Sequence, residues 1–285
     1  MVPGVLDSVT ASPLALAELH LETLYETDDA GRIVYRSADV PAPRIHLVRT
    51  AVGNLWLLGA TLGEAEAQRL GEILAQEPAL PAGDMAVPRP PQIEHTLSRQ
   101  SALRNLSRGP ALVFTRPVSA PLAANAEHVM HPSADARFQG SLRWVRDVLP
   151  TEHPITACFV NDQAVSVCHS PARGAGAAEA GVETNLNQRR RGHATAVVAA
   201  WARLFQRDGV LPMYGTTWDN VASRVTRHAP SRPSSACACT PKTGMSTNGH
   251  AATRMRKGGQ RPPGFARLAL EAGWLLRLAL PALLQ

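Results

Sequence analysis

The stretch from residue 180 to residue 217 constrains the fold of this chain most, because a basic turn containing glycine joins a strand to a helix there. An apolar run over 180–184 leads to the sequence Arg-Arg-Arg-Gly-His-Ala at 189–194. From there to Phe205, apolar residues recur at helical spacing, and Asp208-Gly209 stops the helix. A second apolar run follows over 211–217. The pattern predicts strand, turn, helix and strand in that order.

The turn in this stretch has the properties of an anion site. The first N–H groups of a helix have no internal partner and carry the positive end of the helix dipole, so they bind phosphate when a turn groups them. Gly192 lets backbone approach an anion where a Cβ would intervene, and Ala194 keeps the next turn nearly as open. Three arginines add positive charge at the rim. A surface turn with a solvated arginine run is the alternative interpretation of these residues taken alone.

The same turn carries a resemblance to a known family. It matches the signature R/Q-x-x-G-x-G/A, so the chain resembles the GNAT superfamily of acyl-CoA N-acyltransferases. The resemblance implies that the turn holds the pyrophosphate of acetyl-CoA, that the strand before it bonds the pantetheine arm, and that the next strand diverges to leave a slot for that arm. The sequence at 218–223 is similar to the family's later motif, in which an Asn at the start of a helix faces the cofactor. The implied cofactor-binding residues are Val182, Thr184, Arg189, Arg190, Arg191, Gly192, His193, Ala194, Asn220 and Ser223.

The fold class implied by the resemblance is α/β (α+β). We expect a GNAT-like mixed, mostly antiparallel sheet flanked by helices, preceded by a small α+β N-terminal module. Periodicity predicts helices at 13–24, 63–76, 122–129 and 138–149, and strands at 44–48, 55–58, 111–114, 155–160 and 164–168. The expected division is an N-terminal module at 1–100, an acetyl-CoA-binding domain at 101–225 and an aberrant, disordered tail at 226–285.

Three residues are candidates for the chemistry of acetyl transfer. Such a transfer requires a neutral amine, a group that takes its proton, donors for the developing oxyanion and a proton for the leaving thiolate. Glu183 lies on the strand before the turn, where many members of the family place a carboxylate that accepts the amine proton; a strand residue facing solvent or paired with an arginine is the alternative. His169 and Tyr214 are weaker candidates for proton transfer. The family's usual thiolate donor is a Tyr in the helix after the Asn motif, and no Tyr follows Tyr214.

The positive charge of the chain belongs to its last part. Residues 1–223 hold 19 Arg and no Lys against 22 acidic residues, whereas residues 224–285 hold ten basic residues against one Glu. The composition changes abruptly near residue 226, where a GNAT chain would continue through a helix to a final strand. We interpret the end as frameshifted, with a tail that evolved as such as the alternative. The tail has no aromatic residues among its charges before Phe265, which disfavours nucleic acid as a partner.

The cysteines and histidines predict no metal site. Cys158 and Cys168 fall on neighbouring predicted strands as small buried residues, and Cys237 and Cys239 lack a second ligand pair. The isolated His20, His46 and His95 are interpreted as packing or surface residues. The start of the chain lacks a secretory pattern, and charges and a proline interrupt the apolar segment 265–284, so a cytoplasmic protein without a membrane anchor is expected.

Two functions remain after these exclusions. The first is an N-acetyltransferase that moves an acetyl group from acetyl-CoA to a primary amine of a small molecule or a protein. The second is a catalytically impaired, GNAT-like coenzyme A-binding protein that lacks the final helix and strand. The absent C-terminal tyrosine favours the second, and the intact turn is compatible with both.

Overall fold

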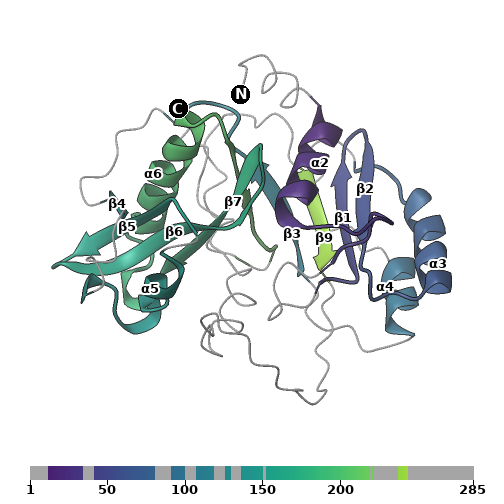
Figure 1. The fold of residues 1–285 in the computed structure, drawn as a ribbon, viewed down its shortest axis with the longest axis horizontal. Helices are drawn as coiled ribbons and strands as arrows, with labels where there is room; N and C mark the ends of the chain where they lie inside the picture. Colours follow the sequence, from purple (N-terminus) through teal and green to yellow (C-terminus); the bar gives the residue numbers. More distant parts are fainter. Residues whose placement is uncertain are drawn as a thin grey trace.

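The described strands form one nine-stranded sheet in the order β2-β1-β9-β3-β8-β7-β6-β5-β4 (Figure 1). This computed structural model describes residues 12–34, 42–80, 91–99, 107–118, 126–129, 136–149, 152–218, 220 and 237–242. The strands are β1 (Ile45–Thr50), β2 (Gly53–Leu58), β3 (Ser107–Val113), β4 (Ala126–Val129), β5 (Ile155–Val160), β6 (Gln163–Arg173), β7 (Ala177–Thr184), β8 (Leu211–Gly215) and β9 (Cys237–Lys242). Among them, β7 and β8 form the one parallel pair, and the other neighbours are antiparallel. The expected mixed, mostly antiparallel sheet is confirmed.

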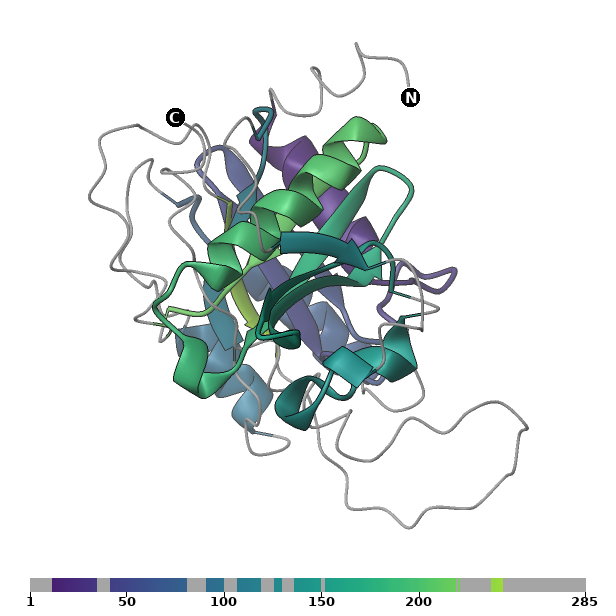
Figure 2. The ribbon, with the colours of Figure 1, turned by 90° about the vertical axis from the view of Figure 1, so that its left-hand side faces the viewer.

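Helices cover both faces of this sheet. In β7, Ala177 packs with Leu16 of the first described helix, whereas Ala178 packs on the other side among residues of the helix after the glycine turn. Side chains alternate across a strand, so the two helices lie on opposite faces (Figure 2). In the same way, Val48 and Leu47 of β1 face different helices. One face carries α2 (Pro13–Leu24), η2 (Gly140–Leu142) and α5 (Val145–Val148); the other carries α3 (Glu64–Ala75), α4 (Pro91–Ser98) and α6 (His193–Arg207).

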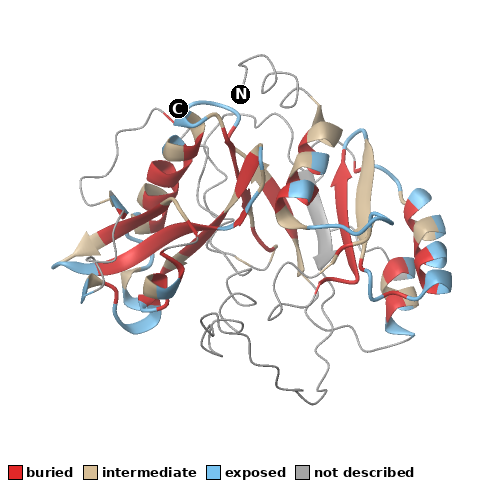
Figure 3. Ribbon diagram, in the orientation of Figure 1, coloured by how far each residue is buried: buried red, intermediate tan, exposed pale blue. Residues whose placement is uncertain are grey.

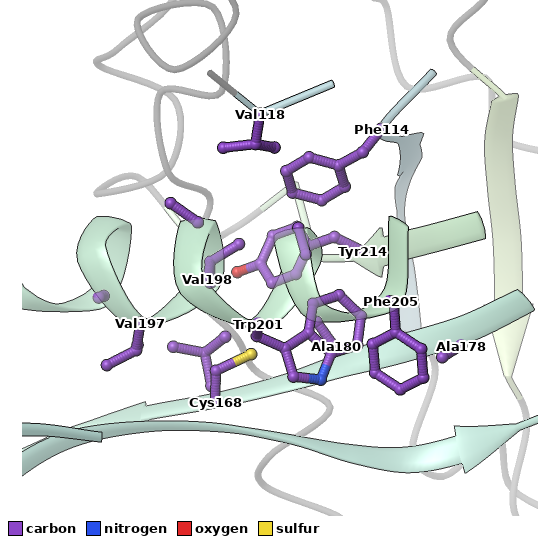
Figure 4. Close-up of a cluster of buried hydrophobic side chains, with 14 of the residues drawn as sticks. Phe114, Val118, Cys168, Ala178, Ala180, Val197, Val198, Trp201, Phe205 and Tyr214 are labelled. Carbon is purple, nitrogen blue, oxygen red and sulfur yellow. The ribbon is translucent and has the colours of Figure 1, made fainter. Parts of the chain in front are cut away.

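The largest side chains of the core lie between α6 and the sheet (Figure 4). Trp201 and Phe205 are fully buried, with ring centroids 4.8 Å apart. The indole Nε1 of Trp201 donates a hydrogen bond of 2.9 Å to Oγ of Ser170 on β6, which satisfies its polar atom inside the core. Truncation of such a tryptophan to alanine costs about 3–5 kcal/mol. This packing fixes α6, and therefore the turn before it, against β6 and β7.

The N-terminal part is continuous with the rest of the sheet. The predicted strands at 44–48 and 55–58 are confirmed as β1 and β2, which pair antiparallel, and the predicted helices at 13–24 and 63–76 are confirmed as α2 and α3. All six residues of β1 are buried, whereas α3 exposes Glu64, Arg69 and Glu72 and buries Glu66 (Figure 3). The division of the chain at residues 100 and 225 stays a prediction.

Part of the predicted tail belongs to the sheet. Strand β9 pairs antiparallel with β1 on one side and with β3 on the other. For these six residues the structure differs from the expectation of disorder, because their backbone groups complete the ladder between two strands that otherwise have no neighbour there. The rest of 226–285 lies outside the described residues.

Two predicted helices are wrong in whole or in part. Residues 126–129, placed in a helix at 122–129, form β4, since their backbone pairs with the edge of β5; residues 121–125 lie outside the described residues. The predicted helix at 138–149 is divided into η2 and α5. Gly140 adopts a φ of +56°, which a continuous right-handed helix does not allow. Its apolar side is nevertheless buried as expected, with Phe138, Leu142 and Val145 in one cluster.

No helix in the described ranges is long and apolar enough to cross a bilayer. The apolar segment 265–284 lies outside these ranges.

Candidate functional site

Strands β7 and β8 separate halfway along β7. Their parallel register covers Ala177 with Leu211, 178 with 212, and Glu179 with Met213. Beyond that point β7 continues to Thr184 beside β6 alone, while β8 stays paired with β3. One edge of residues 180–184 therefore has no strand partner within the described part of the chain. This is the divergence that the sequence resemblance implies.

The end of β7 leads through η3 (Leu186–Gln188) to the turn before α6. Gly192 is the N-cap residue of α6 and has a φ of +82°, and Arg190 also lies in the left-handed region with a φ of +62°. A Cβ at Gly192 would meet no atom within 4 Å, so the position faces open space. Glycine is favoured here by the positive φ and not by crowding. No side chain caps the first turn of α6, whose first internal bond runs from the N–H of Ala196 to the carbonyl of Gly192 at 3.1 Å.

The charged residues of the turn surround this open space. Arg189, Arg190 and Arg191 are exposed, and Nε of Arg189 donates to the carbonyl of Thr184 at 3.4 Å, which ties the turn to the end of β7. Burial, and then the positive charge of Arg191, lower the pKa of His193, so its ring is neutral at pH 7. The uncapped N–H groups, the open space and the exposed arginines fit a pyrophosphate.

The other predicted cofactor residues either have side chains that face the core, so that only their backbone groups could bind a cofactor, or lie near or beyond the end of the described range 152–220. The side chain of Val182 is buried beneath α6. Oγ1 of Thr184 lies 2.7 Å from Oγ of Ser166. The side chains of Val182 and Thr184 therefore face the core. Ala194 is 4 % exposed and packs in the same core, which explains the small residue at this position. Asn220 donates its N–H to the carbonyl of residue 217 at 3.2 Å. Ser223 and the helix expected after residue 220 lie outside the described residues.

Glu183 and His169 lie on the opposite face, under η2 and α5. Oε2 of Glu183 accepts a hydrogen bond of 2.9 Å from Nε1 of Trp144. Nδ1 of His169 lies 2.6 Å from Oε2 of Glu152, and the rings of His169 and Trp144 are 4.8 Å apart. Trp144 therefore contacts two of the three predicted catalytic residues, Glu183 and His169.

The environment of Glu183 favours its protonated form. Burial raises the pKa of its carboxyl above the ordinary value, and the hydrogen bond from Trp144 and the nearby charges of His169 and Arg189 oppose this rise without cancelling it. A carboxylate with a raised pKa is a stronger base, which suits proton transfer near neutral pH.

Tyr214 is not brought together with these residues. It is 1 % exposed and lies inside the core cluster beneath α6, near Val198 and Trp201 (Figure 4). The sheet thus separates its hydroxyl from Glu183 and His169, and its predicted role in proton transfer stays a prediction.

A second carboxylate lies where β7 and β8 separate. Oε1 of Glu179 accepts a hydrogen bond of 2.5 Å from the backbone N–H of Gly215 on β8, and its Oε2 lies 3.4 Å from Nε2 of His20 on α2. The side chain of His20 is buried, with an exposed fraction of 5 %, and that of Glu179 is partly buried, with an exposed fraction of 12 %. The ring of His46 lies beside that of His20, with centroids 6.0 Å apart. Nδ1 of His46 in turn lies 2.7 Å from the hydroxyl of Tyr25.

Trp144, Glu152 and Glu179 belong to the polar groups around the predicted site, and none of them was predicted from the sequence. Strand alternation is a signal for Glu179, since it has the parity of Glu183 in β7. Trp144 and Glu152 come from segments that are distant in sequence from Glu183. No residue spacing in the sequence therefore predicts that they lie near it. His20 and His46 are buried, as packing histidines are, but they also belong to a polar group. No cluster of three metal-binding side chains occurs among the described residues.

No family model and no curated protein matches the sequence. Among solved structures, the chain is similar to a putative acetyltransferase from the GNAT family of Novosphingobium aromaticivorans, with 15% identity and a TM-score of 0.37 over 50% of this chain and 67% of that one. It is also similar to a GCN5-related N-acetyltransferase from Kribbella flavida, with 17% identity and a TM-score of 0.37 over 54% of this chain and 65% of that one.

A third similar structure is an acetyltransferase from the GNAT family of Colwellia psychrerythraea, with 9% identity and a TM-score of 0.38 over 76% of this chain and 79% of that one. The matches to the first two proteins span about two thirds of their length.

Proposed function

We propose that the chain is an N-acetyltransferase that moves an acetyl group from acetyl-CoA to a primary amine. The observation that carries the proposal is the combination of two features: the divergence of β7 from β8 after Glu179, and the uncapped N-terminus of α6 with its left-handed Gly192 at the end of the same strand. The free edge of β7 is suited to bond an extended arm, and the turn is suited to bind the pyrophosphate at the end of that arm.

Each predicted binding residue has a role in this proposal. The N–H groups of Gly192, His193 and Ala194 bind phosphate oxygens, and the arginines neutralise their charge. Backbone groups of 182 and 184 bond the amides of the pantetheine arm. Asn220 and Ser223 complete the cofactor site from the segment after β8. Acetyl-CoA acts as a co-substrate, and the proposal needs no metal.

Glu183 is the proposed base. It takes a proton from the ammonium group of the acceptor, and the free amine then attacks the thioester carbonyl. The new C–N bond forms, the C–S bond breaks with its electron pair on sulfur, and the second amine proton passes to the thiolate. Trp144 holds the carboxylate in place. His169, oriented by Glu152, is the alternative base, and Tyr214 is the weakest candidate.

The second candidate function is coenzyme A binding without turnover. It is favoured by the position of Tyr214, because the last tyrosine of the chain lies in the apolar core on the face opposite Glu183. In this case the turn would bind the nucleotide end as before, and no group would protonate the thiolate.

A turnover screen separates the two functions. The purified full chain is mixed with acetyl-CoA and a panel of small amines, polyamines and peptides with free amino groups, and products are identified by mass spectrometry. The proposal predicts a mass gain of one acetyl group on at least one amine, with release of coenzyme A. Saturable acetyl-CoA binding without any acetylated product would favour the binding protein. The compartment, expected to be the cytoplasm, and the absence of nucleic-acid or membrane partners stay proposals.

A further inference from the structure

We infer that Glu179 is a wedge that keeps β7 and β8 apart, and that His20 of α2 holds this wedge in place. The inference rests on the proposed function, because the separated strands are the site of the acetyl-CoA arm. It assigns a positioning role to a carboxylate of β7 and to a histidine outside the strand–turn–helix unit.

The first step is the position of Glu179 in the ladder. It is the last residue of β7 that is in register with β8, opposite Met213. In a continuing parallel ladder, the next N–H groups of β8 on this side would be bonded by carbonyls of β7. Instead, Oε1 of Glu179 accepts the N–H of Gly215 at 2.5 Å. A side-chain oxygen thus replaces a backbone acceptor, and the ladder ends there.

The second step is the residue that receives the wedge. A Cβ added at Gly215 would lie 2.7 Å from Oε1 of Glu179, closer than carbon and oxygen approach without a shift. The glycine therefore leaves the space that the carboxylate occupies. A larger residue would displace the carboxylate or the strand.

The third step is the support from α2. The second oxygen of Glu179 is buried and has no hydrogen-bond partner among the described residues, but it lies 3.4 Å from Nε2 of His20. Leu16 of the same helix packs on Ala177 and Met213, directly beside the wedge. Helix α2 therefore contacts both the apolar residues of the last paired part of β7 and β8 and the carboxylate of Glu179, where the two strands separate.

The consequence concerns ligand binding. Without the wedge, β8 is free to extend its pairing along β7 and occupy the edge that the acetyl-CoA arm needs. Loss of the wedge is expected to weaken acetyl-CoA binding although none of these residues belongs to the phosphate turn. The amide of glutamine still offers an oxygen to the N–H of Gly215, whereas leucine has a similar size and offers none.

The test is calorimetry of acetyl-CoA with the full chain and four variants. Glu179→Leu and Gly215→Ala are expected to weaken binding by about tenfold or more, His20→Phe by a smaller factor, and Glu179→Gln by less than about threefold, the differences expected from loss or retention of one charge-assisted hydrogen bond. Glu72→Leu, at an exposed carboxylate of α3, is the matched control and should leave binding unchanged. NMR of the Gly215 amide proton reports the wedge directly, with a large shift in Glu179→Leu.

The outcomes separate this inference from the proposed function. If the unmodified chain does not bind acetyl-CoA, both fail. If it binds and Glu179→Leu binds equally well, or if Glu179→Gln is as impaired as Glu179→Leu, the proposed acetyl-CoA site is not contradicted and the wedge is wrong.

Discussion

Nε1 of Trp144 donates a hydrogen bond of 2.9 Å to Oε2 of Glu183 and joins the segment after η2 to the strand that precedes the phosphate turn. The bond stabilises the ionised carboxylate, whereas burial destabilises it, and burial is the larger effect on the pKa of Glu183. This single hydrogen bond therefore lowers the pKa of the proposed base and fixes the orientation of its carboxylate.

Replacing Trp144 by phenylalanine tests this tuning. The aromatic ring remains, but the donor is lost, so the pKa of Glu183 is expected to rise further. The acidic limb of the pH profile of kcat/KM should move to higher pH. An unmoved limb would show that the titration belongs to another group.

Replacing Glu183 by glutamine tests the base itself. Glutamine keeps the size of the side chain and can still accept the hydrogen bond from Trp144, but it takes no proton. We expect kcat/KM to fall by about 10²-fold while acetyl-CoA affinity stays nearly constant. A loss below about threefold, with the acidic limb retained, would mean that the proton leaves by another route. His169→Gln in parallel tests the alternative base.

The same variant has a predicted effect on stability. The pKa of Glu183 is higher in the folded state than in the unfolded state, so its contribution to stability is present at low pH and is lost as pH rises through the folded-state pKa. At a pH above the folded-state pKa of Glu183, the ionised carboxylate therefore opposes folding. Glu183→Gln is expected to keep or raise the Tm at pH 7, measured by thermal unfolding, and a clear fall in Tm would contradict the assigned burial.

Cys158 and Cys168 are expected to be unreactive in the folded protein. Burial raises the pKa of the Cys158 thiol to about 11 and that of Cys168 well above its usual range, so neither forms the reactive thiolate near pH 8. Alkylation at pH 8, followed by peptide mass spectrometry, should leave both unmodified until denaturant is added. Rapid alkylation of either in the native chain would show that its strand is open.

Truncation after residue 225 tests the place of β9 in the sheet. It removes the strand between β1 and β3 and leaves both with unpaired edges. We expect a lower Tm than for the full chain. An unchanged Tm, together with rapid proteolysis of 237–242 in the full chain, would support the interpretation of residues 226–285 as a disordered, frameshifted end.

The parts of the fold that depend on local pattern were predictable from the sequence. Periodicity predicted α2, α6 and the strands β5 and β6, and the glycine turn predicted where α6 starts. The failures have tertiary causes. The backbone of 126–129 pairs with an edge strand, and Gly140 interrupts a pattern that reads as one helix. The meeting of Glu179 with His20 joins residues 159 positions apart in the chain, and no local spacing encodes such a contact.

The central claim is that the turn before α6 binds the pyrophosphate of acetyl-CoA, and calorimetry of Gly192→Asp tests it most directly. The variant places a like charge and a side chain in the open space beside the uncapped N–H groups. Gly31→Asp is the matched control, since Gly31 also has a positive φ, of +71°, and open space for a Cβ, but lies in a separate turn. We predict that Gly192→Asp weakens acetyl-CoA binding by at least about tenfold, as loss of a phosphate contact requires, while Gly31→Asp leaves it unchanged. Equal affinity of the two variants and the unmodified chain would contradict the assignment of this turn.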